Sequence, residues 1–329
     1  MRSRLPYVLA AAAALAAGLA FLPGLLRHGD APAGASGEAR QASAGARTPG
    51  APAPLRPCVS EVVAAGAFQP YLRLNYLVKA VPLDLAESEI GALLGFIRQP
   101  RPAGFTELQW GSVVNDIEEI LTTQRVPSGR VARALSSIRR DPAAPAVLRD
   151  YALQHLGGFC IHLVRTAGGD RPGFFPGMLA EVAEAAGKRD DPSAGTAINL
   201  LDGILRAAEE TGRPVPGLDP DRVVALALPL AADQAAPLNA RLPALQAAAR
   251  RGSPEALAVA RSVLAAPRSG PEAPHFMLVQ GACAALGRLG GAGDCPALAA
   301  VRDSGDPRLA PAALAALRSI ASRSTPGAR

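Results

Sequence analysis

Aromatic residues are scarce in this sequence: phenylalanine, tyrosine and tryptophan together make up only 4% of its 329 residues. The apolar fraction is nevertheless an ordinary 49%. A folded core must therefore be built from aliphatic side chains. The scarcity also weighs against nucleic acid as a partner, because single strands are commonly bound on interleaved aromatic side chains.

Two further patterns are missing. No segment shows the alternating Val, Thr and Tyr pattern that is typical of β-strands, and the helix formers alanine and leucine dominate instead. The sequence therefore predicts an all-α fold. The four cysteines show neither Cys-x-x-Cys spacing nor the density of a disulfide scaffold.

Acidic residues are outnumbered, with 28 Asp and Glu against 34 Lys and Arg and a net charge of +6. Such a balance is compatible with binding to nucleic acid or anionic lipid, or with solubility alone. High Ala, Gly, Pro and Arg together are also typical of a GC-rich coding sequence, which explains much of the basicity without a partner. We expect no nucleic-acid partner.

The apolar run Leu5–Leu26 follows Arg2 and Arg4. About 20 residues are enough to cross a bilayer, so we predict that residues 1–28 form a signal anchor or transmembrane helix with its N-terminus in the cytoplasm. The alternative is a cleaved secretory signal peptide with a site such as Gly18-Leu19-Ala20, which would leave the chain secreted or periplasmic. The anchor is favoured because the run continues to Leu26 without a polar region.

Residues 29–57 consist mainly of Ala, Gly, Pro and Ser and have no apolar period. Such a segment cannot bury a core, so we predict a disordered linker. Residues 58–324 form the predicted helical domain, and residues 325–329 a disordered tail. On this plan the helical domain lies on the extracytoplasmic side of the cell membrane.

Proline, glycine and aspartate divide the domain into helices. Four pairs of residues predict helix starts in which Asp or Ser caps the helix and Pro takes its first position: Asp191-Pro192, Asp219-Pro220, Ser253-Pro254 and Asp306-Pro307. The predicted helices begin at Pro70 (with Leu72, Tyr76 and Leu77 on one side) and at Glu107, and span Leu85–Ile97, Gly129–Arg140, Pro145–Leu163, Met178–Ala186, Ala194–Ala208, Asp221–Ala231, Leu238–Ala249, Pro254–Leu264 and His275–Leu289.

A repeat is visible near the end of the chain. Leu286 and Leu289 recur as Leu317 and Ile320, a shift of 31 residues (317 − 286). Between them lie a glycine-rich break, a short apolar helix and a polar turn. Repeats of about 20–50 residues built from paired helices are the signature of an α-solenoid, in which each pair buries its apolar face only against its neighbours.

The residues of this region resemble a known family. The run Ala285-Leu286-Gly287-Arg288-Leu289-Gly290, the helix start Cys295-Pro296-Ala297-Leu298 and the turn Asp306-Pro307 resemble HEAT-like repeats, and Leu148–Gly157 resembles the first helix of the same unit. The resemblance is clearest over residues 280–322. It implies an α-solenoid of HEAT-like helix pairs, a fold whose members mostly act as interaction scaffolds. A minority resemble chromophore lyases, and no residue here marks that activity.

Polar residues on two helices form the first candidate site. Asn115, Asp116 and Glu119 lie opposite the apolar stripe of their helix, which consists of Trp110, Val113, Val114, Ile117 and Leu121. Arg149, Asp150, Gln154 and His155 crowd the helix after next. If stacking brings these helices together, the two sets would form a shared polar surface, which we interpret as an interaction surface.

A basic helix forms the second candidate site. Arg130, Arg133 and Arg140 lie on one helix face, opposite Val131, Leu135 and Ile138. This face would suit anionic lipid headgroups or an acidic partner. A solvated helix face is the alternative.

The sequence supports a metal site or a disulfide less well than it supports the two surfaces above. His155 and His162 share a helix side with Cys160 nearby, but seven residues separate the histidines by roughly 10 Å, which is too far for one ion. We therefore expect no metal site, and no motif indicates a cofactor. Cys283 and Cys295 lie on consecutive helices and could pair in an oxidising compartment, or could be two small buried hydrophobes.

Together these patterns predict a non-enzymatic, membrane-tethered protein-interaction scaffold in the bacterial cell envelope, with another protein as its partner and the membrane contacted through Leu5–Leu26. The alternative is a periplasmic or secreted enzyme, or an enzyme accessory, with a polar site near Asp116, Arg149 and His155.

Overall fold

The computed structural model describes residues 54–65, 71–167, 170–267, 269–270 and 273–324. The chain divides into two units between Pro54 and Leu55, and the fold described below belongs to the second. The predicted signal anchor, nearly all of the predicted linker and the predicted C-terminal tail lie outside the described residues. They remain predictions, as do the domain boundaries.

The described residues contain fourteen α-helices, one 3₁₀ turn and no strand, so the all-α prediction is confirmed for this part of the chain. The α-helices are α2 (Pro57–Ala65), α3 (Tyr71–Lys79), α4 (Glu87–Ile97), α5 (Glu107–Thr122), α6 (Gly129–Arg140), α7 (Ala146–Thr166), α8 (Phe175–Gly187), α9 (Ala194–Thr211), α10 (Pro220–Ala232), α11 (Leu238–Arg250), α12 (Pro254–Ala265), α13 (Phe276–Leu289), α14 (Cys295–Arg302) and α15 (Ala310–Ser324).

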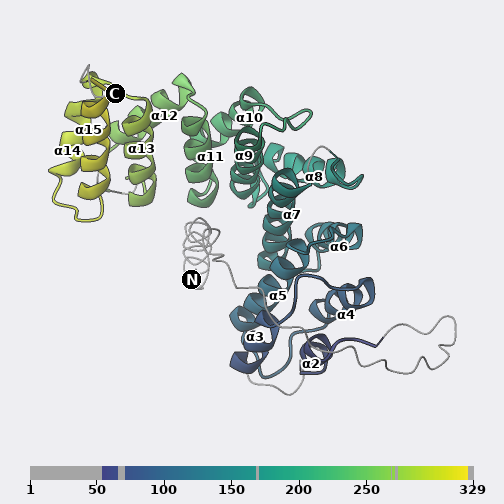
Figure 1. Cartoon of the computed structure of the whole chain (residues 1–329). Helices are drawn as coiled ribbons and strands as arrows, with labels where there is room; N and C mark the ends of the chain where they lie inside the picture. The colour runs from purple at the N-terminus through teal and green to yellow at the C-terminus, as the bar shows by residue number, and fades with distance from the viewer. Residues whose placement is uncertain (1–53, 66–70, 168–169, 268, 271–272, 325–329) are drawn as a thin grey trace, which may run out of the picture. The chain divides into compact units, whose positions relative to one another are not determined.

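The helices pack as pairs that stack in chain order (Figure 1). Each even-numbered helix packs on the odd-numbered helix that follows it, from α2 with α3 to α14 with α15. Each helix also packs on the helix two places further along, so the odd-numbered helices form one row and the even-numbered helices another. We call these the odd row and the even row. This is a solenoid-like arrangement, in which a pair hides its apolar face only against its neighbours.

Helix boundaries and the core stripe of α5 follow the sequence closely. The predicted helix Gly129–Arg140 is α6 without change. Trp110, Val113 and Ile117 are buried, as are Val114 and Leu121. Thr106 caps α5 by accepting a hydrogen bond from the backbone N–H of Gln109. The core is aliphatic along most of its length, and Phe96, Phe105 and Trp110 form an aromatic cluster at one end of it.

Leu72 and Tyr76 lie on one side of α3, and this side is exposed. Their exposed fractions are 79% and 75%, whereas Leu74 and Val78 are buried. The two sets differ by two positions, about 200° around a helix, so they lie on opposite faces. Helix α3 therefore carries apolar residues on both of its sides.

Two of the four predicted helix starts are wrong. Asp219 and Ser253 cap α10 and α12, each with proline in the first turn, as predicted. Asp191 and Asp306 do not cap helices. Each instead accepts a hydrogen bond from the backbone N–H two residues on, and α9 and α15 begin three and four residues later. Asp is equally suited to such a local turn and to a cap, so the residue pair alone does not distinguish them.

No helix among the described residues has the length and apolar character needed to cross a membrane. The run Leu5–Leu26 lies outside them.

Glycine allows close helix contacts within the odd row. A Cβ atom added at Gly195 of α9 would lie 2.5 Å from the backbone oxygen of Asn239 and 2.6 Å from the Cα of Ala240 at the start of α11. At Gly287 of α13 it would lie 2.9 Å from the Cα of Ala316 in α15. At both positions the obstacle is backbone, which cannot turn aside as a flexible side chain can. These positions therefore require the absence of a side chain.

Arginines join successive odd-row helices at their C-terminal ends. Arg288 of α13 donates to the backbone oxygen of Arg250 at the end of α11, and Arg323 of α15 donates to that of Gly290 just after α13. Arg213, just after α9, donates to the backbone oxygen of Arg165 near the end of α7. The last carbonyls of a helix lack hydrogen-bond donors within that helix and carry partial negative charge. A guanidinium group supplies the missing donors and a positive charge.

The contact at Gly195 predicts opposite effects for two otherwise similar substitutions. Gly195→Ala should lower the free energy of unfolding by about 1–3 kcal/mol, because α9 and α11 must move apart. Gly158→Ala, in the interior of α7 with no atom within 4 Å of the added Cβ, should raise it by about 0.5–1 kcal/mol through helix propensity. Urea unfolding of the purified full chain measures both. Equal effects of the two substitutions would contradict the close contact.

Candidate functional site

A chain of polar contacts crosses three consecutive helices of the odd row. Asn75 of α3 donates to the Oδ2 atom of Asp116 in α5 at 3.1 Å. The neighbouring Asn115 places its Oδ1 atom 3.1 Å from Nε2 of His155 in α7 and its Nδ2 atom 3.5 Å from the Oδ1 atom of Asp116. Stacking therefore brings together Asn115, Asp116 and His155 of the predicted surface. Asn75 is a member that the sequence did not indicate.

A buried carboxylate lies beneath this chain of contacts. Glu118 is 0% exposed, and neither of its carboxylate oxygens has a hydrogen-bond partner among the described residues. Its Oε2 atom lies 3.7 Å from Nε2 of His155, which is itself buried. A buried polar group without a partner is costly and rare in folded proteins.

Burial favours the neutral form of both groups. It raises the pKa of Glu118 well above its usual value, and it lowers the pKa of His155 to about 4 against the smaller opposing effect of its contact with Asn115. The separation of 3.7 Å would permit an ion pair. However, removing two charges from water outweighs their attraction when few other hydrogen bonds satisfy them. Burial therefore favours the uncharged form of each group, a carboxylic acid in Glu118 and a neutral imidazole in His155.

Further carboxylates surround this pair. The pKa of Glu119 is raised by burial and by the charge of Asp116, and that of Tyr151 by burial and by the charges of Asp150 and Glu118. We call Asp116, Glu119 and Asp150 the carboxylate face, and the buried Glu118 lies beneath it. The nearby His155 is neutral, so this part of the odd row carries a surplus of negative charge.

Two other predicted members of the surface, Gln154 and Arg149, take no part in this chain of contacts. Gln154 donates to Asp150 within α7 at 2.8 Å. Arg149 lines a pocket of about 550 Å³ together with Arg139, Lys188 and Asp191. The predicted surface therefore divides into two places, with Arg149 in the pocket between α7 and the loop that precedes α9.

The predicted basic helix is α6, and two of its three arginines are engaged within the fold. Arg130 donates to the backbone oxygen of Glu87 at 3.3 Å, and Arg140 lies 3.3 Å from the carboxylate of the buried Glu181. Arg133 is exposed. Contact with anionic lipid through this helix remains a prediction.

Cys283 is buried in α13, and the half-buried Cys295 begins α14. Their pairing remains a prediction. Among the described residues, no group of three or more His, Cys, Asp or Glu side chains could hold a metal ion.

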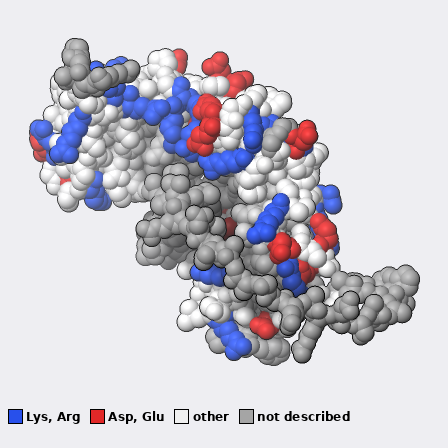
Figure 2. All heavy atoms as spheres, viewed as in Figure 1, with Lys and Arg blue, Asp and Glu red and all other residues white. Residues whose placement is uncertain are grey.

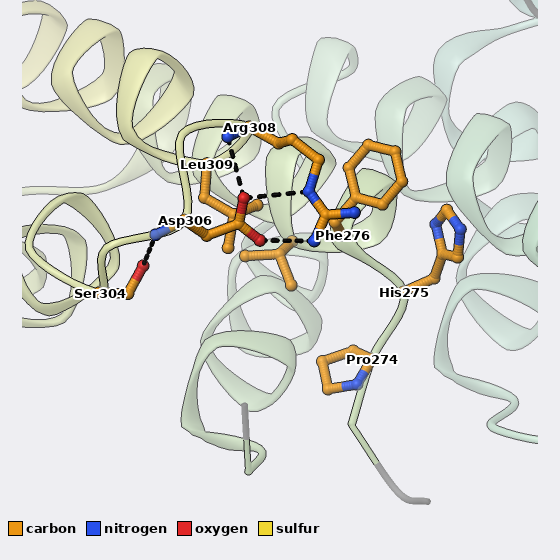
Figure 3. A pocket seen from close by; sticks show the side chains of 8 residues that line it. Pro274, His275, Phe276, Ser304, Asp306, Arg308 and Leu309 are labelled. Carbon is orange, nitrogen blue, oxygen red and sulfur yellow. Dashed lines mark hydrogen bonds and ion pairs between the residues drawn. The ribbon is translucent and has the colours of Figure 1, made fainter. Parts of the chain in front are cut away.

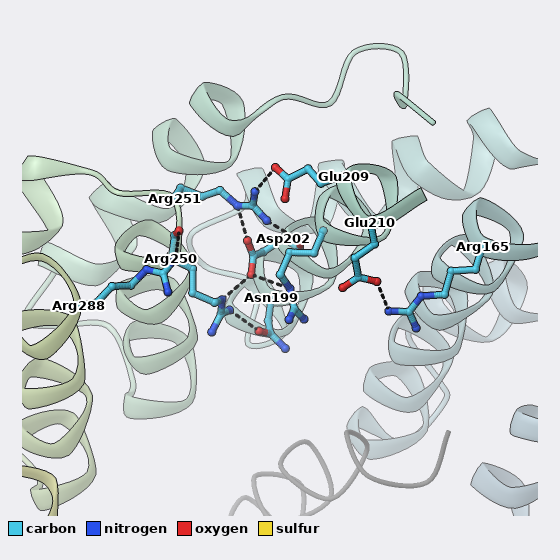
Figure 4. Close-up of polar contacts among 9 residues, drawn as sticks. Arg165, Asn199, Asp202, Glu209, Glu210, Arg250, Arg251 and Arg288 are labelled. Carbon is cyan, nitrogen blue, oxygen red and sulfur yellow. Dashed lines mark hydrogen bonds and ion pairs between the residues drawn. The ribbon is translucent and has the colours of Figure 1, made fainter. Parts of the chain in front are cut away.

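A second polar centre, which the sequence did not indicate, joins α9 to α11 (Figure 4). Asp202 is fully buried, and its two oxygens accept hydrogen bonds from Nε of Arg251 and Nε of Arg250, each at 2.6 Å. Arg250 also donates to Asn199, and Arg251 to Glu209. Basic side chains are numerous over this part of the molecule in Figure 2.

Glu118 and Asp202 share a sequence signal that could have revealed both. Each lies on an apolar stripe of its helix: Glu118 is four residues after Val114, and Asp202 is four residues after Ile198. All four residues are buried. A carboxylate at a stripe position is either paired or neutral, and the sequence does not show which partner reaches it.

A pocket of about 400 Å³ lies where α13 begins and the loop before α15 passes (Figure 3). Arg308 forms an ion pair with Asp306 at 2.7 Å and stacks over the ring of Phe276. His275 caps α13 through its Nδ1 atom, which accepts from the backbone N–H of Met277. The charged groups of this pocket satisfy one another.

Comparisons with known proteins identify no family. No protein-family model and no curated protein matches the chain. Among solved structures, the chain is similar to human deoxyhypusine hydroxylase in complex with glycerol, at 17% identity over 80% of this chain and 97% of that chain, with a TM-score of 0.31.

This comparison corrects the predicted function. The sequence indicated a non-enzymatic, membrane-tethered scaffold in the cell envelope, whereas the similar structure is that of an enzyme by its name. The scaffold prediction is therefore contradicted by the structure that the chain is similar to, and it is not carried further. A likeness at this level assigns neither the hydroxylase activity nor its substrate to this chain.

The burial of Glu118 predicts a pH-dependent gain of stability in Glu118→Gln. Because the folded-state pKa is raised, the carboxyl group contributes stability below its unfolded pKa and loses that contribution as pH rises through the folded value. The stability of Glu118→Gln relative to wild type should therefore increase between pH 5 and pH 8, by up to about 1.4 kcal/mol per unit of raised pKa. Thermal unfolding at both pH values measures it. Glu61→Gln, at an exposed position of α2, is the control, and a pH-independent difference for Glu118→Gln would contradict the burial.

The centre at Asp202 predicts a large loss of stability when its charge is removed. Asp202→Asn should lower the free energy of unfolding by about 3–5 kcal/mol, because Arg250 and Arg251 lose their shared counter-ion. Glu210→Gln breaks the exposed pair with Arg165 and should cost no more than about 1 kcal/mol. Denaturant titration compares the two variants. A loss at Asp202→Asn as small as that at Glu210→Gln would show that the centre contributes little.

Proposed function

We propose that this chain is an enzyme, or an accessory that presents ligand to an enzyme, and that it binds a ligand bearing amine or guanidinium groups on the carboxylate face of α5 and α7. The observation that carries the proposal is the contact chain from Asn75 through Asp116 and Asn115 to His155, above the unpartnered carboxyl group of Glu118. The burial of Glu118 is not explained by the stability of the fold, because its carboxyl oxygens have no hydrogen-bond partner among the described residues.

The charge of the face supports a cationic ligand. The pKa of Glu119 is raised, because burial and the charge of Asp116 both disfavour its ionised form. A cation placed between the two carboxylates would relieve this repulsion and would gain charge-assisted hydrogen bonds. Asn75 and Asn115 hold Asp116 from two sides and fix its orientation.

The buried pair supports the enzyme branch of the proposal. Glu118, whose pKa is raised, lies 3.7 Å from His155, whose pKa is lowered. Pairs of titratable groups whose pKa values are shifted by their surroundings are used in general acid–base catalysis. Glu118→Gln separates the two branches. In an enzyme it would abolish turnover and leave ligand binding intact, whereas in an accessory it would leave the partner enzyme's turnover unchanged.

We further propose that the helix pairs are HEAT-like repeats. The 31-residue recurrence of Leu286 and Leu289 at Leu317 and Ile320, on helices α13 and α15 that pack together, supports this. For location, we propose that Leu5–Leu26 directs the chain to the cell membrane as an anchor, with secretion or a periplasmic location after cleavage as the alternative.

Binding of a cationic probe tests the proposed function. Tetralysine should bind the full chain, and the double variant Asp116→Asn/Glu119→Gln should weaken binding by about tenfold or more, since each lost charge-assisted hydrogen bond to the probe contributes about 1.5–3 kcal/mol. Isothermal titration at low ionic strength measures the affinity.

The control variant is Glu61→Gln/Asp221→Asn, which removes two exposed carboxylates from the even row and should leave the affinity unchanged. Equal weakening in the two double variants would show that tetralysine responds only to net charge, and absence of binding to the wild type would also refute the proposal. Photo-crosslinking from position 154 in cells then tests whether the captured molecule is an enzyme or its substrate.

A further inference from the structure

We propose that the centre around Asp202 is also a binding site for an oxyanion, a phosphate or carboxylate group, which would be held by Arg206 and Arg250 on the odd row. The site lies on α9 and α11, apart from the carboxylate face, and does not depend on the function proposed above.

The argument begins with an excess of arginine. Two guanidinium groups are enough to satisfy Asp202, because Nε of Arg251 takes one oxygen and Nε of Arg250 takes the other. A third, that of Arg206, lies 3.7 Å from the oxygen that Arg250 already occupies. The Nε atom of Arg206 is buried and has no hydrogen-bond partner among the described residues.

The charges at the centre do not balance. Three guanidinium groups, from Arg206, Arg250 and Arg251, face the two carboxylates of Asp202 and Glu209. Arg206 and Arg250 approach the same carboxylate oxygen and therefore repel each other. A protein that needed only to join α9 to α11 would be more stable without Arg206.

Exposure distinguishes the structural arginine from the other two. The side chain of Arg251 is 6% exposed and is held by two carboxylates, whereas those of Arg250 and Arg206 are 29% and 43% exposed. Figure 4 shows Arg250 beside Asn199, to which its Nη2 atom donates. Solvent therefore reaches the two arginines that retain donors.

The chemistry of these donors selects the ligand class. Guanidinium groups bind carboxylate and phosphate oxygens through planar, paired N–H donors, and they remain charged at any physiological pH. An oxyanion at Arg206 and Arg250 would supply the missing negative charge. The buried carboxylate of Asp202 would keep both arginines in place when no ligand is bound.

Thermal unfolding of the full chain in phosphate, glutarate and chloride at matched ionic strength tests the proposal. Matching removes the general effect of screening, and a ligand that binds only the folded state raises the unfolding temperature. Phosphate or glutarate should raise the unfolding temperature above that in chloride, and the more effective of the two identifies the group. In Arg206→Gln the affinity derived from this shift should fall about tenfold or more.

Two further variants keep the result interpretable. Arg165→Gln removes an arginine of similar exposure, 40%, from a surface pair and should leave the shift unchanged. Arg206→Lys keeps the charge but loses the paired donors, so its affinity should also fall. Without ligand, Arg206→Gln should be at least as stable as wild type, which shows that it folds.

The proposal is overturned if neither anion raises the unfolding temperature of the wild type above that in chloride. It is also overturned if Arg206→Gln and Arg165→Gln reduce the shift equally, or if ligand-free Arg206→Gln is clearly less stable than wild type. The last result would make Arg206 a structural partner of Asp202.

Discussion

The contact between each odd-row helix and the next one in the row is the constraint on which the rest of this structure depends. A single helix pair cannot hide its apolar face, so the face must be covered by the following pair. At Gly195 and Gly287 the facing atoms belong to the backbone of the next helix in the row. Helices that approach so closely cannot slide or rotate much past one another. The polar side chains that they carry are therefore held in register from one helix to the next. This explains how Asn75 of α3 reaches Asp116 of α5, and how Asn115 of α5 reaches His155 of α7.

The same constraint gives the basic composition a structural explanation. At the C-terminal end of each odd-row helix, carbonyl groups lack partners within that helix. Arg213, Arg288 and Arg323 donate to carbonyl groups of this kind on the preceding odd-row helix or just after it. Arg250 and Arg251 share a buried carboxylate. Base composition of the coding sequence explains why arginine is available in such numbers. It does not explain these positions, at which a planar group with several donors bridges two helices. The net positive charge therefore includes arginines that join helices, and by itself it does not identify an external partner.

The fold was largely predictable from the sequence, and the sites only partly so. Periodicity and punctuation locate helices such as Gly129–Arg140 well, because apolar spacing and capping are local properties. The starts at Asp191 and Asp306 were misplaced because Asp serves turns as well as caps. For the sites, the sequence indicated Asn115, Asp116 and His155 but not Glu118 or Asp202. Both of these carboxylates stand at stripe positions, and their roles depend on side chains about 40–50 residues away, among them His155, Arg250 and Arg251. Pairing over such distances follows from stacking, which a local pattern does not contain.

The joint at Asp202 also has a mechanical consequence. When a linear stack of helices is pulled from its ends, the same force acts on every interface between neighbouring helices. The weakest interface therefore separates first, and unfolding stops at the strongest one. Between α9 and α11 a carboxylate removed from water binds two guanidinium groups, while the glycine contact at Gly195 locks the same two helices at their other ends. If the chain is pulled from its two termini, the outer pairs should peel away one after another. The helices around α9 and α11 would remain folded, and the chain would lengthen by unfolding of the helices on either side of them.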